Sequence, residues 1–228
     1  MKQTDYLIGI SRRNAFTRFI KPPNPCLNYN TKYLKKLVLT ADKENERILD
    51  IGSGGRKLAK KVINIDIDEF EDVIIVSDAG NLPLRSNSVD LVILTAVLEH
   101  VKCPDKIASE IFRVLKTNGR LYVESPFLYP FHADPIDFQR YTLKGLINLF
   151  SAFEVLDKGV CVGPFSAVAV FIRKFSTIFF KNDFLAKSIE FLIAWIIFWI
   201  KYFDLFLIKF QRLHVVAAGL YLLLQKKE

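Results

Sequence analysis

Short apolar runs alternate with polar and helix-patterned segments through the middle of the chain. These runs occupy residues 47–51, 62–67, 73–76, 91–95 and 121–124. Continuous apolar runs of this kind are typical of strands that are buried on both faces of a parallel sheet. Residues 104–115 instead carry apolar side chains on one helical stripe, and Thr117-Asn118-Gly119 supplies a helix-ending signal. The pattern predicts an α/β fold, a doubly wound and mostly parallel sheet.

Residues 1–46 are predicted to form an N-terminal arm followed by a helix that covers the sheet. The arm contains Pro22-Pro23-Asn24-Pro25, which cannot lie inside a helix because proline lacks a backbone donor. Asn28 is the expected N-cap of the helix through residues 33–38. No apolar run near the start has the length of a signal-peptide core, so we expect no secretion and a cytoplasmic catalytic domain.

The chain changes character after residue 150. Residues 153–156 and 215–224 are predicted strands that pair as a C-terminal antiparallel hairpin. Between them, residues 165–212 are rich in aromatic and aliphatic side chains and are predicted to be an apolar helical insertion. Residues 47–228 would then form one domain that contains this insertion.

The apolar insertion has the composition of a segment that meets lipid. Residues 191–200 are uncharged, but a spanning helix needs roughly 20 apolar residues, a length reached here only by including Lys201 and Asp204. We therefore expect helices that lie in the membrane plane, making the protein peripheral to, or monotopic in, the inner face of a membrane. A buried lid or a dimer interface is the alternative. The residues expected to face anionic headgroups are Arg173, Lys174, Lys181, Lys187, Lys201, Lys209 and Arg212.

Composition agrees with this picture and limits the partners. Apolar residues make up 51% of the 228, with 20 Phe, and the formal net charge is +8. A basic field attracts anionic lipid or nucleic acid without specifying either. Cys26, Cys103 and Cys161 are too far apart in sequence for a zinc motif or a disulfide framework, so a reducing compartment and no metal centre are expected.

The first predicted strand leads into a glycine turn, Asp50-Ile51-Gly52-Ser53-Gly54-Gly55, expected to open a helix. Glycine lets a ligand approach the backbone where a Cβ would collide. A dinucleotide fingerprint starting at Gly52 requires glycine at position 57, which is Lys57, and no phosphate-loop sequence follows. The turn therefore favours a nucleoside without phosphates.

Carboxylates follow the next predicted strands and suit such a nucleoside. Asp66 ends the second apolar run, where a carboxylate can accept both ribose hydroxyls. Asp78 follows the third run and is expected at the adenine edge, while Asp50 holds the turn or contacts the amino-acid end of the ligand. The alternative is a plain tight connection with solvated aspartates.

The stretches LDIGSGG, NIDID and SDAGNLPLRSNSVDLVILTAVLEHVKCPDKIASEIFRVLKTNGRLYVESPF, within residues 47–127, resemble the class I S-adenosylmethionine-dependent methyltransferases of the small-molecule type. The resemblance implies a Rossmann-like fold and S-adenosylmethionine as cofactor. The third glycine of the family motif comes one residue early here, as Gly55. Glu99-His100 either contacts the methionine portion of the cofactor or begins a helix. The cofactor contacts implied are Asp50, Gly52, Ser53, Gly54, Asp66, Ile67, Asp78, Ala79 and Thr95.

Chemistry-bearing residues also gather in the loop that follows the fifth predicted strand. His132 is the expected general base, with Asp134 or Asp137 orienting it, because the usual pKa of histidine lies near neutrality. Arg140 is expected to bind a carboxylate or phosphate of the substrate. In the alternative, Asp137 pairs with Arg140 and Thr142 caps the next helix.

The string HADPIDFQRYT is similar to methyltransferases associated with cell-surface polysaccharide and glycolipid assembly. We therefore expect methyl transfer, to oxygen, on a small or lipid-linked, sugar-type acceptor. Two alternatives stay open: a nicotinamide-dependent epimerase or reductase, and a nucleoside-binding module without catalysis. Nucleic acid ranks lower as a substrate because the chain lacks the Asn/Asp-Pro-Pro-aromatic motif that holds a flipped base. The sequence leaves the oligomeric state open.

Overall fold

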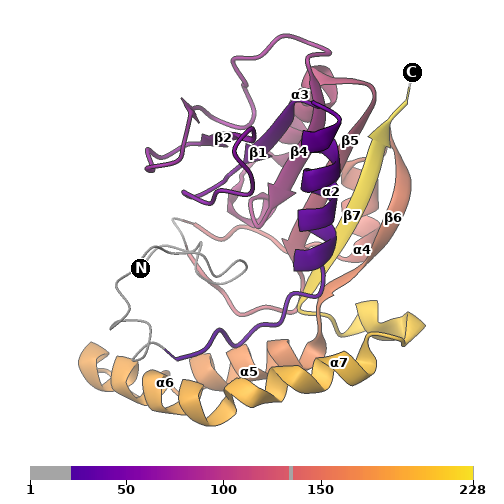
Figure 1. Cartoon of the computed structure of the whole chain (residues 1–228). Helices are drawn as coiled ribbons and strands as arrows, with labels where there is room; N and C mark the ends of the chain where they lie inside the picture. Colours follow the sequence, from indigo (N-terminus) through magenta and orange to yellow (C-terminus); the bar gives the residue numbers. More distant parts are fainter. Residues whose placement is uncertain (1–21, 134–135, 228) are drawn as a thin grey trace.

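The computed structural model describes residues 22–133 and 136–227, so the first part of the predicted arm and Asp134 lie outside the described residues. Seven strands form one sheet in the order β3-β2-β1-β4-β5-β7-β6 (Figure 1). The strands are β1 (Ile48–Ile51), β2 (Ile63–Asp66), β3 (Ile75–Val76), β4 (Val89–Thr95), β5 (Leu115–Pro126), β6 (Phe153–Val162) and β7 (Gly219–Lys226). The helices are α2 (Thr31–Lys43), η2 (Leu98–His100), α3 (Pro104–Val114), α4 (Leu143–Leu149), α5 (Pro164–Phe175), α6 (Asp183–Ile197), η3 (Phe198–Phe203), α7 (Asp204–Leu207) and η4 (Gln211–Val215).

The pairing of the strands confirms a mostly parallel sheet with a C-terminal antiparallel hairpin. Strands β1 to β5 pair in parallel, and β7 runs antiparallel between β5 and β6. In the centre, Ile51 of β1 is in register with Leu94 of β4. The carboxyl ends of β1, β2 and β4 therefore meet at one edge, where ligands bind in open α/β sheets.

Both faces of the sheet are buried, which explains the continuous apolar runs. Successive side chains of a strand point to opposite faces. Helix α2 covers one face, while α3 and α4 cover the other (Figure 1). The α2 face is formed by Leu34, Val38, Ala41, Ile48, Leu91, Ile93 and Tyr122. The opposite face is formed by Leu49, Val92, Leu94, Leu121, Val123, Ile107, Ile111, Leu146 and Phe150.

Two local predictions about helix ends are wrong. No helix follows the glycine turn: residues 52–62 are turns and irregular chain, because this connection is too short to hold three left-handed glycines and a helix before β2 begins. Helix α3 ends at Val114 and continues directly into β5, so Thr117-Asn118-Gly119 lies within the strand. Asn118 does adopt the left-handed conformation typical of a helix end, with φ 64°, but it does so within the strand.

The N-cap of α2 is Asn30, not Asn28. The Asn28 side chain accepts the backbone N–H of Asn30 at 2.8 Å, and its Nδ2 donates to Oε2 of Glu124 at 2.8 Å. Asn28 also forms a bridge with Val162 at the end of β6. The residue predicted to cap the helix instead fixes the incoming chain to the sheet.

The segment between β6 and β7, from α5 to η4 (residues 164–215), forms what we call the helical layer. It extends along one end of the sheet (Figure 1). The last strand begins at Gly219 rather than at Val215, because residues 211–215 form η4. In the described ranges of the chain, no helix is long and apolar enough to cross a membrane.

Several charges of the helical layer are bound within the protein, contrary to the prediction that all its cations face headgroups. Arg173 and Lys174 both pair with Glu190, at 3.0 and 2.9 Å. Lys201 is buried and donates to the carbonyl oxygen of Asn24. The cations of the layer that remain exposed are Lys181, Lys187, Lys209 and Arg212.

Candidate active site

The glycine turn follows β1 and is held against the end of β2. Gly52, Gly54 and Gly55 all have left-handed backbones, with φ of 67°, 56° and 80°. The N–H groups of Gly52 and Ser53 donate to the carbonyl oxygen of Ile65, at 2.8 and 3.2 Å. A side chain at Gly52 would also collide with Val97. Glycine at this position is required both by backbone conformation and by space.

Asp66 ties the end of β2 to the turn. Its Oδ2 accepts the N–H of Gly54 at 2.7 Å, and its Oδ1 accepts the N–H of Asp68 at 3.1 Å. Asp78 follows β3, where its Oδ1 accepts the N–H of Gly80 at 2.9 Å, and the neighbouring Ala79 packs against the sheet. Both carboxylates lie at strand ends, and their contacts with ribose and adenine stay predictions.

Asp50 is fully buried and forms an ion pair with Arg56. Nε of Arg56 donates to Oδ2 of Asp50 at 2.9 Å, Nη2 donates to Oδ1, and Nη1 donates to the hydroxyl of Thr95. Burial raises the pKa of Asp50 above its usual value, and Arg56 opposes that shift. Of the two roles expected for Asp50, the geometry supports holding the turn.

The residues around the turn suit the cofactor implied by the resemblance. The hydroxyl oxygen of Ser53 is buried and lacks a hydrogen-bond partner among the described residues, so a ligand atom can satisfy it. Ile67 follows Asp66 and is 69% exposed, which leaves an apolar surface for a flat ring. When bound, S-adenosylmethionine supplies an electrophilic methyl group, and the chain supplies the contacts that orient it.

The loop after β5 is fastened to η2, which follows β4. The N–H of Phe138 donates to the carbonyl oxygen of Glu99 at 2.7 Å. The side-chain amide of Gln139 donates to Leu98 and Val101, at 3.0 and 2.9 Å. These bonds bring His132 of the loop and Glu99 of η2 to one place, although 33 residues separate them in sequence.

Asp137 and Arg140 form an ion pair beside His132, which is the alternative that the sequence left open. Oδ2 of Asp137 accepts the backbone N–H of His132 at 2.9 Å and lies 3.4 Å from its Nδ1. Burial raises the pKa of Asp137, but the bonds from Arg140 and His132 outweigh burial and the net pKa is lowered. Arg140 therefore holds Asp137 beside His132 and also contacts the ring directly, with Nη2 3.3 Å from Nδ1. Thr142 caps α4 by accepting the N–H of Gly145.

Glu99 is completely buried, and neither carboxylate oxygen has a hydrogen-bond partner among the described residues. Its Oε1 lies 3.7 Å from Nε2 of His100 and 3.9 Å from Nε2 of His132. Burial raises the pKa of Glu99 to about 8, and burial lowers the pKa of His132. At neutral pH the imidazole of His132 is therefore uncharged.

A pocket opens between this cluster and the ends of β5, β6 and β7. Glu99, Glu124 and His132 form its polar wall. Glu124 accepts the hydroxyl of Tyr122 at 2.5 Å and the amide of Asn28 at 2.8 Å. Its remaining lining residues are Cys26, Ser125, Pro126, Tyr129, Cys161, Val162, Ala218 and Gly219.

Sequence reasoning missed Arg56 and Glu124. The signal for Glu124 was a carboxylate at the end of a buried strand, the same signal that selected Asp66. For Arg56 the sequence contains no signal beyond its place directly after Gly55. Its pairing with Asp50 arises only when the glycine turn reverses the chain.

Comparison with known proteins agrees with this architecture. Residues 29–123 match the sequence model of the Methyltransferase domain family, Methyltransf_11. No curated protein sequence matches the chain significantly.

Solved structures with the same fold include methyltransferases and one enzyme of another kind. A proposed sarcosine dimethylglycine methyltransferase from Galdieria sulphuraria aligns with a TM-score of 0.51 and 15% identity, over 87% of this chain and 86% of its own. A proposed methyltransferase from Bacillus halodurans aligns with a TM-score of 0.51 and 17% identity, over 86% of this chain and 100% of its own. The cyclase SpnF aligns at 0.52 and 20% identity, over 86% of this chain and 80% of its own.

At these identities the structures show the fold, and SpnF illustrates that one fold hosts different reactions. The assignment rests instead on the family match, which spans the strands that carry the glycine turn and both aspartates. This match, on a sheet of this order, supports a class I S-adenosylmethionine-dependent methyltransferase.

Proposed function

We propose that the protein methylates an oxygen of a lipid-linked, sugar-type acceptor at the surface of a membrane. The observation that carries this proposal is the exposed apolar face of the helical layer, whose inner side packs against residues that line the pocket.

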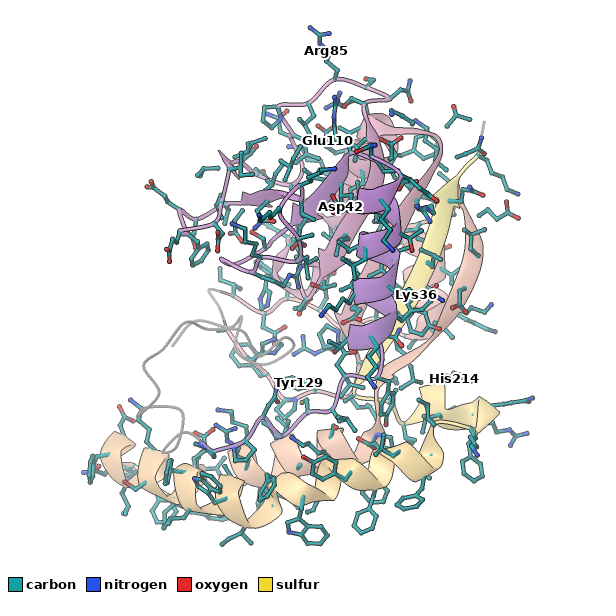
Figure 2. All side chains as sticks on the ribbon, in the orientation of Figure 1. Lys36, Asp42, Arg85, Glu110, Tyr129 and His214 are labelled. Carbon is teal, nitrogen blue, oxygen red and sulfur yellow. The ribbon has the colours of Figure 1, made fainter. Side chains whose placement is uncertain are left out.

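Aromatic and aliphatic side chains cover the outer side of the helical layer. Figure 2 shows a row of ring side chains on the side of the helices that faces away from the sheet. Phe184 and Phe206 are 81% and 74% exposed. Monomeric soluble proteins rarely expose contiguous apolar patches of this kind. The exposed residues include Phe171, Phe175, Phe184, Leu192, Trp195, Ile196, Trp199, Phe203, Phe206 and Phe210.

Charge supports lipid as the partner of this face. The layer carries four exposed cations but only one exposed acid among its described residues, Asp183, so its surface is positively charged. The two charges that interrupt the apolar run, Lys201 and Asp204, are buried in the protein. Insertion of the apolar face into a bilayer would therefore not transfer these two charges from water to lipid. The exposed cations are available for anionic headgroups.

The pocket is in packing contact with the same layer. Cys26, Cys161, Val162 and Ala218 line it, and they pack in one cluster with Val170 of α5. Tyr129, also a lining residue, lies between the sheet and the layer (Figure 2). An acceptor with an apolar carrier and a polar reacting end suits a pocket that is apolar toward the layer and polar toward His132.

We assign activation of the acceptor hydroxyl to the wall formed by His132 and Glu99. Methyl transfer to a hydroxyl requires removal of a proton, and the uncharged imidazole of His132 stands at the pocket wall where that hydroxyl would bind. Asp137 and Arg140 hold the imidazole in place from behind.

Vesicle co-sedimentation tests the role of the helical layer. The wild-type chain is expected to sediment with vesicles of phosphatidylglycerol and phosphatidylcholine, and less with phosphatidylcholine alone. The double variant Trp195→Glu with Phe206→Glu should bind at least tenfold more weakly. Leu39→Glu, which replaces a 43% exposed residue of α2, is the matched control and should bind like the wild type.

Failure of the wild-type chain to bind either kind of vesicle would overturn the membrane proposal. Dimerisation through this face, detected by sedimentation velocity and abolished by the same double variant, would identify the layer as an interface between copies of the chain.

A further inference from the structure

The side chains of Glu99, His100 and His132 converge on one point. One ligand atom from each lies within 4.8 Å of the others, and the two distances from Oε1 of Glu99 are 3.7 Å and 3.9 Å. Nitrogen and oxygen ligands of one ion with bonds of about 2.1 Å stand roughly 3.0 to 3.5 Å apart. The two distances from Oε1 of Glu99 exceed that spacing by less than about 1 Å.

Both imidazoles present the nitrogen that a metal needs. Nδ1 of His100 lies 2.6 Å from the carbonyl oxygen of Ile136, so it carries the proton and Nε2 carries a lone pair. Nδ1 of His132 faces two acceptors, the carbonyl oxygen of Pro130 at 3.3 Å and Oδ2 of Asp137 at 3.4 Å. Nη2 of Arg140 lies 3.3 Å from the same nitrogen but makes its shorter bond to Asp137, at 2.5 Å. Because arginine can only donate, a metal on Nε2 requires Nδ1 to keep its proton and to donate it to Asp137 or Pro130 instead. Such outer hydrogen bonds orient metal-binding histidines.

Glu99 supplies the independent sign of a ligand. It is a carboxylate with 0% exposure, aimed at two imidazole nitrogens, and neither of its oxygens receives a hydrogen bond from a described residue. A cation bound at this point would satisfy the buried Glu99 carboxylate, to which the described residues donate no hydrogen bond.

We propose that Glu99, His100 and His132 form a binding site for a divalent transition-metal ion of the zinc or iron type. Two histidines and one carboxylate are a ligand set that such ions take while keeping open positions. When the ion is bound, His132 would hold it and the ion would assist the acceptor hydroxyl. This proposal differs from the expectation of no metal centre that followed from the sequence.

The proposed site lies on the wall of the acceptor pocket, because Glu99 and His132 both line it. An open coordination position there would bind an acceptor hydroxyl, and a bound divalent ion lowers the pKa of such a group. This consequence rests on the proposed function, whereas metal binding itself does not.

Cobalt(II) titration tests the site directly. The full chain, without an affinity tag and with Cys103→Ser to remove the exposed thiol, is treated with a chelator, desalted and titrated while its visible d–d absorption is recorded. One equivalent should bind. Glu99→Gln and His132→Ala should each weaken binding at least tenfold, whereas His214→Ala, which removes a histidine of η4, should leave it unchanged.

S-adenosylmethionine binding, measured by calorimetry on the same metal-free variants, shows that they remain folded and separates this inference from the assigned enzyme class. Absence of saturable cobalt binding in the wild type, or binding that persists in both Glu99→Gln and His132→Ala, would overturn the metal site. Either result leaves the methyltransferase assignment unaffected, because that assignment predicts only that S-adenosylmethionine binds.

Discussion

Asp204 of α7 closes the first turn of α5 by binding Ser166. Its Oδ2 accepts the backbone N–H of Ser166 at 2.9 Å and the hydroxyl at 2.7 Å, while Oδ1 accepts the N–H of Phe165 at 2.7 Å. The first N–H groups of a helix lack partners within the helix, and a carboxylate satisfies them well. A charge that interrupts the apolar run in sequence therefore holds two helices of the layer together.

Replacing Asp204 should loosen the helical layer. Asp204→Ala leaves the N–H groups of Phe165 and Ser166 buried without partners, at a cost of about 1 to 3 kcal/mol in the free energy of unfolding. Urea unfolding and hydrogen exchange across α5 measure the effect. Asp183→Ala, which removes the exposed acid at the start of α6, should change stability by less than about 0.5 kcal/mol. Equal effects of the two variants would contradict the capping role.

Asp66 should be needed for cofactor affinity. Asp66→Ala removes the carboxylate predicted to accept the ribose hydroxyls and frees the N–H of Gly54, so we expect at least tenfold weaker binding of S-adenosylmethionine by calorimetry. Asp68→Ala, which removes an exposed carboxylate two residues later, is the control and should bind normally. Unchanged affinity in Asp66→Ala would remove the ribose assignment.

The pair between Asp50 and Arg56 should control stability at the turn. Arg56→Met leaves a fully buried carboxylate without its cation, which costs about 3 to 5 kcal/mol. Lys57→Met breaks only the exposed pair with Asp72, worth less than about 1 kcal/mol. Urea unfolding at pH 7 compares the two, and a loss in Arg56→Met no larger than that in Lys57→Met would contradict the role of the pair.

The Arg56→Met variant should also acquire a distinct pH dependence. Burial already raises the pKa of Asp50 in the folded wild type, and loss of Arg56 removes the opposing influence. A carboxyl group whose pKa is higher in the folded state than in the unfolded state binds its proton more tightly when the protein is folded. It therefore costs no stability at pH values below the unfolded-state pKa, and it destabilises the fold increasingly as pH rises toward the folded-state pKa. The deficit relative to wild type should therefore shrink between pH 8 and pH 5. A deficit that grows toward acid pH would refute this.

Gly52 should tolerate no side chain. Gly52→Ala places a Cβ against Val97 on a backbone with φ 67°, so we expect a loss of about 2 kcal/mol or more and weakened cofactor binding. Gly80→Ala is the matched control, because its Cβ would meet only the flexible side chain of Lys106 at 3.1 Å and Asp78 at 3.5 Å. If thermal unfolding shows both variants to be equally stable, the turn is less constrained than we describe.

The sheet could be predicted from sequence because its information is local. Each strand from β1 to β5 is an apolar run bounded by polar residues, and the alternation of Leu49 and Ile48 between the two faces follows from the strand period alone. The hairpin of β6 and β7 was likewise visible as two apolar runs. The start of the second strand was misplaced because the apolar residues of the helical layer continue up to it.

The site was less predictable because its contacts join distant segments. Glu99 and His132 lie close together because hydrogen bonds join η2 to the loop near Phe138. No pattern of residue types predicts these bonds. No helix follows Gly55, and the short connection to β2 instead brings Arg56 to Asp50. Local patterns therefore identified the carboxylates at strand ends, and missed the partners that folding brings to them.

Transfer of a labelled methyl group into lipid measures the proposed activity itself. The protein is incubated with methyl-labelled S-adenosylmethionine and membranes from its native cells, which are then extracted with organic solvent. Label should appear in the lipid extract, fall at least a hundredfold with His132→Ala and stay unchanged with His214→Ala. Label that appears only in water-soluble products, or no transfer at all, would contradict the account.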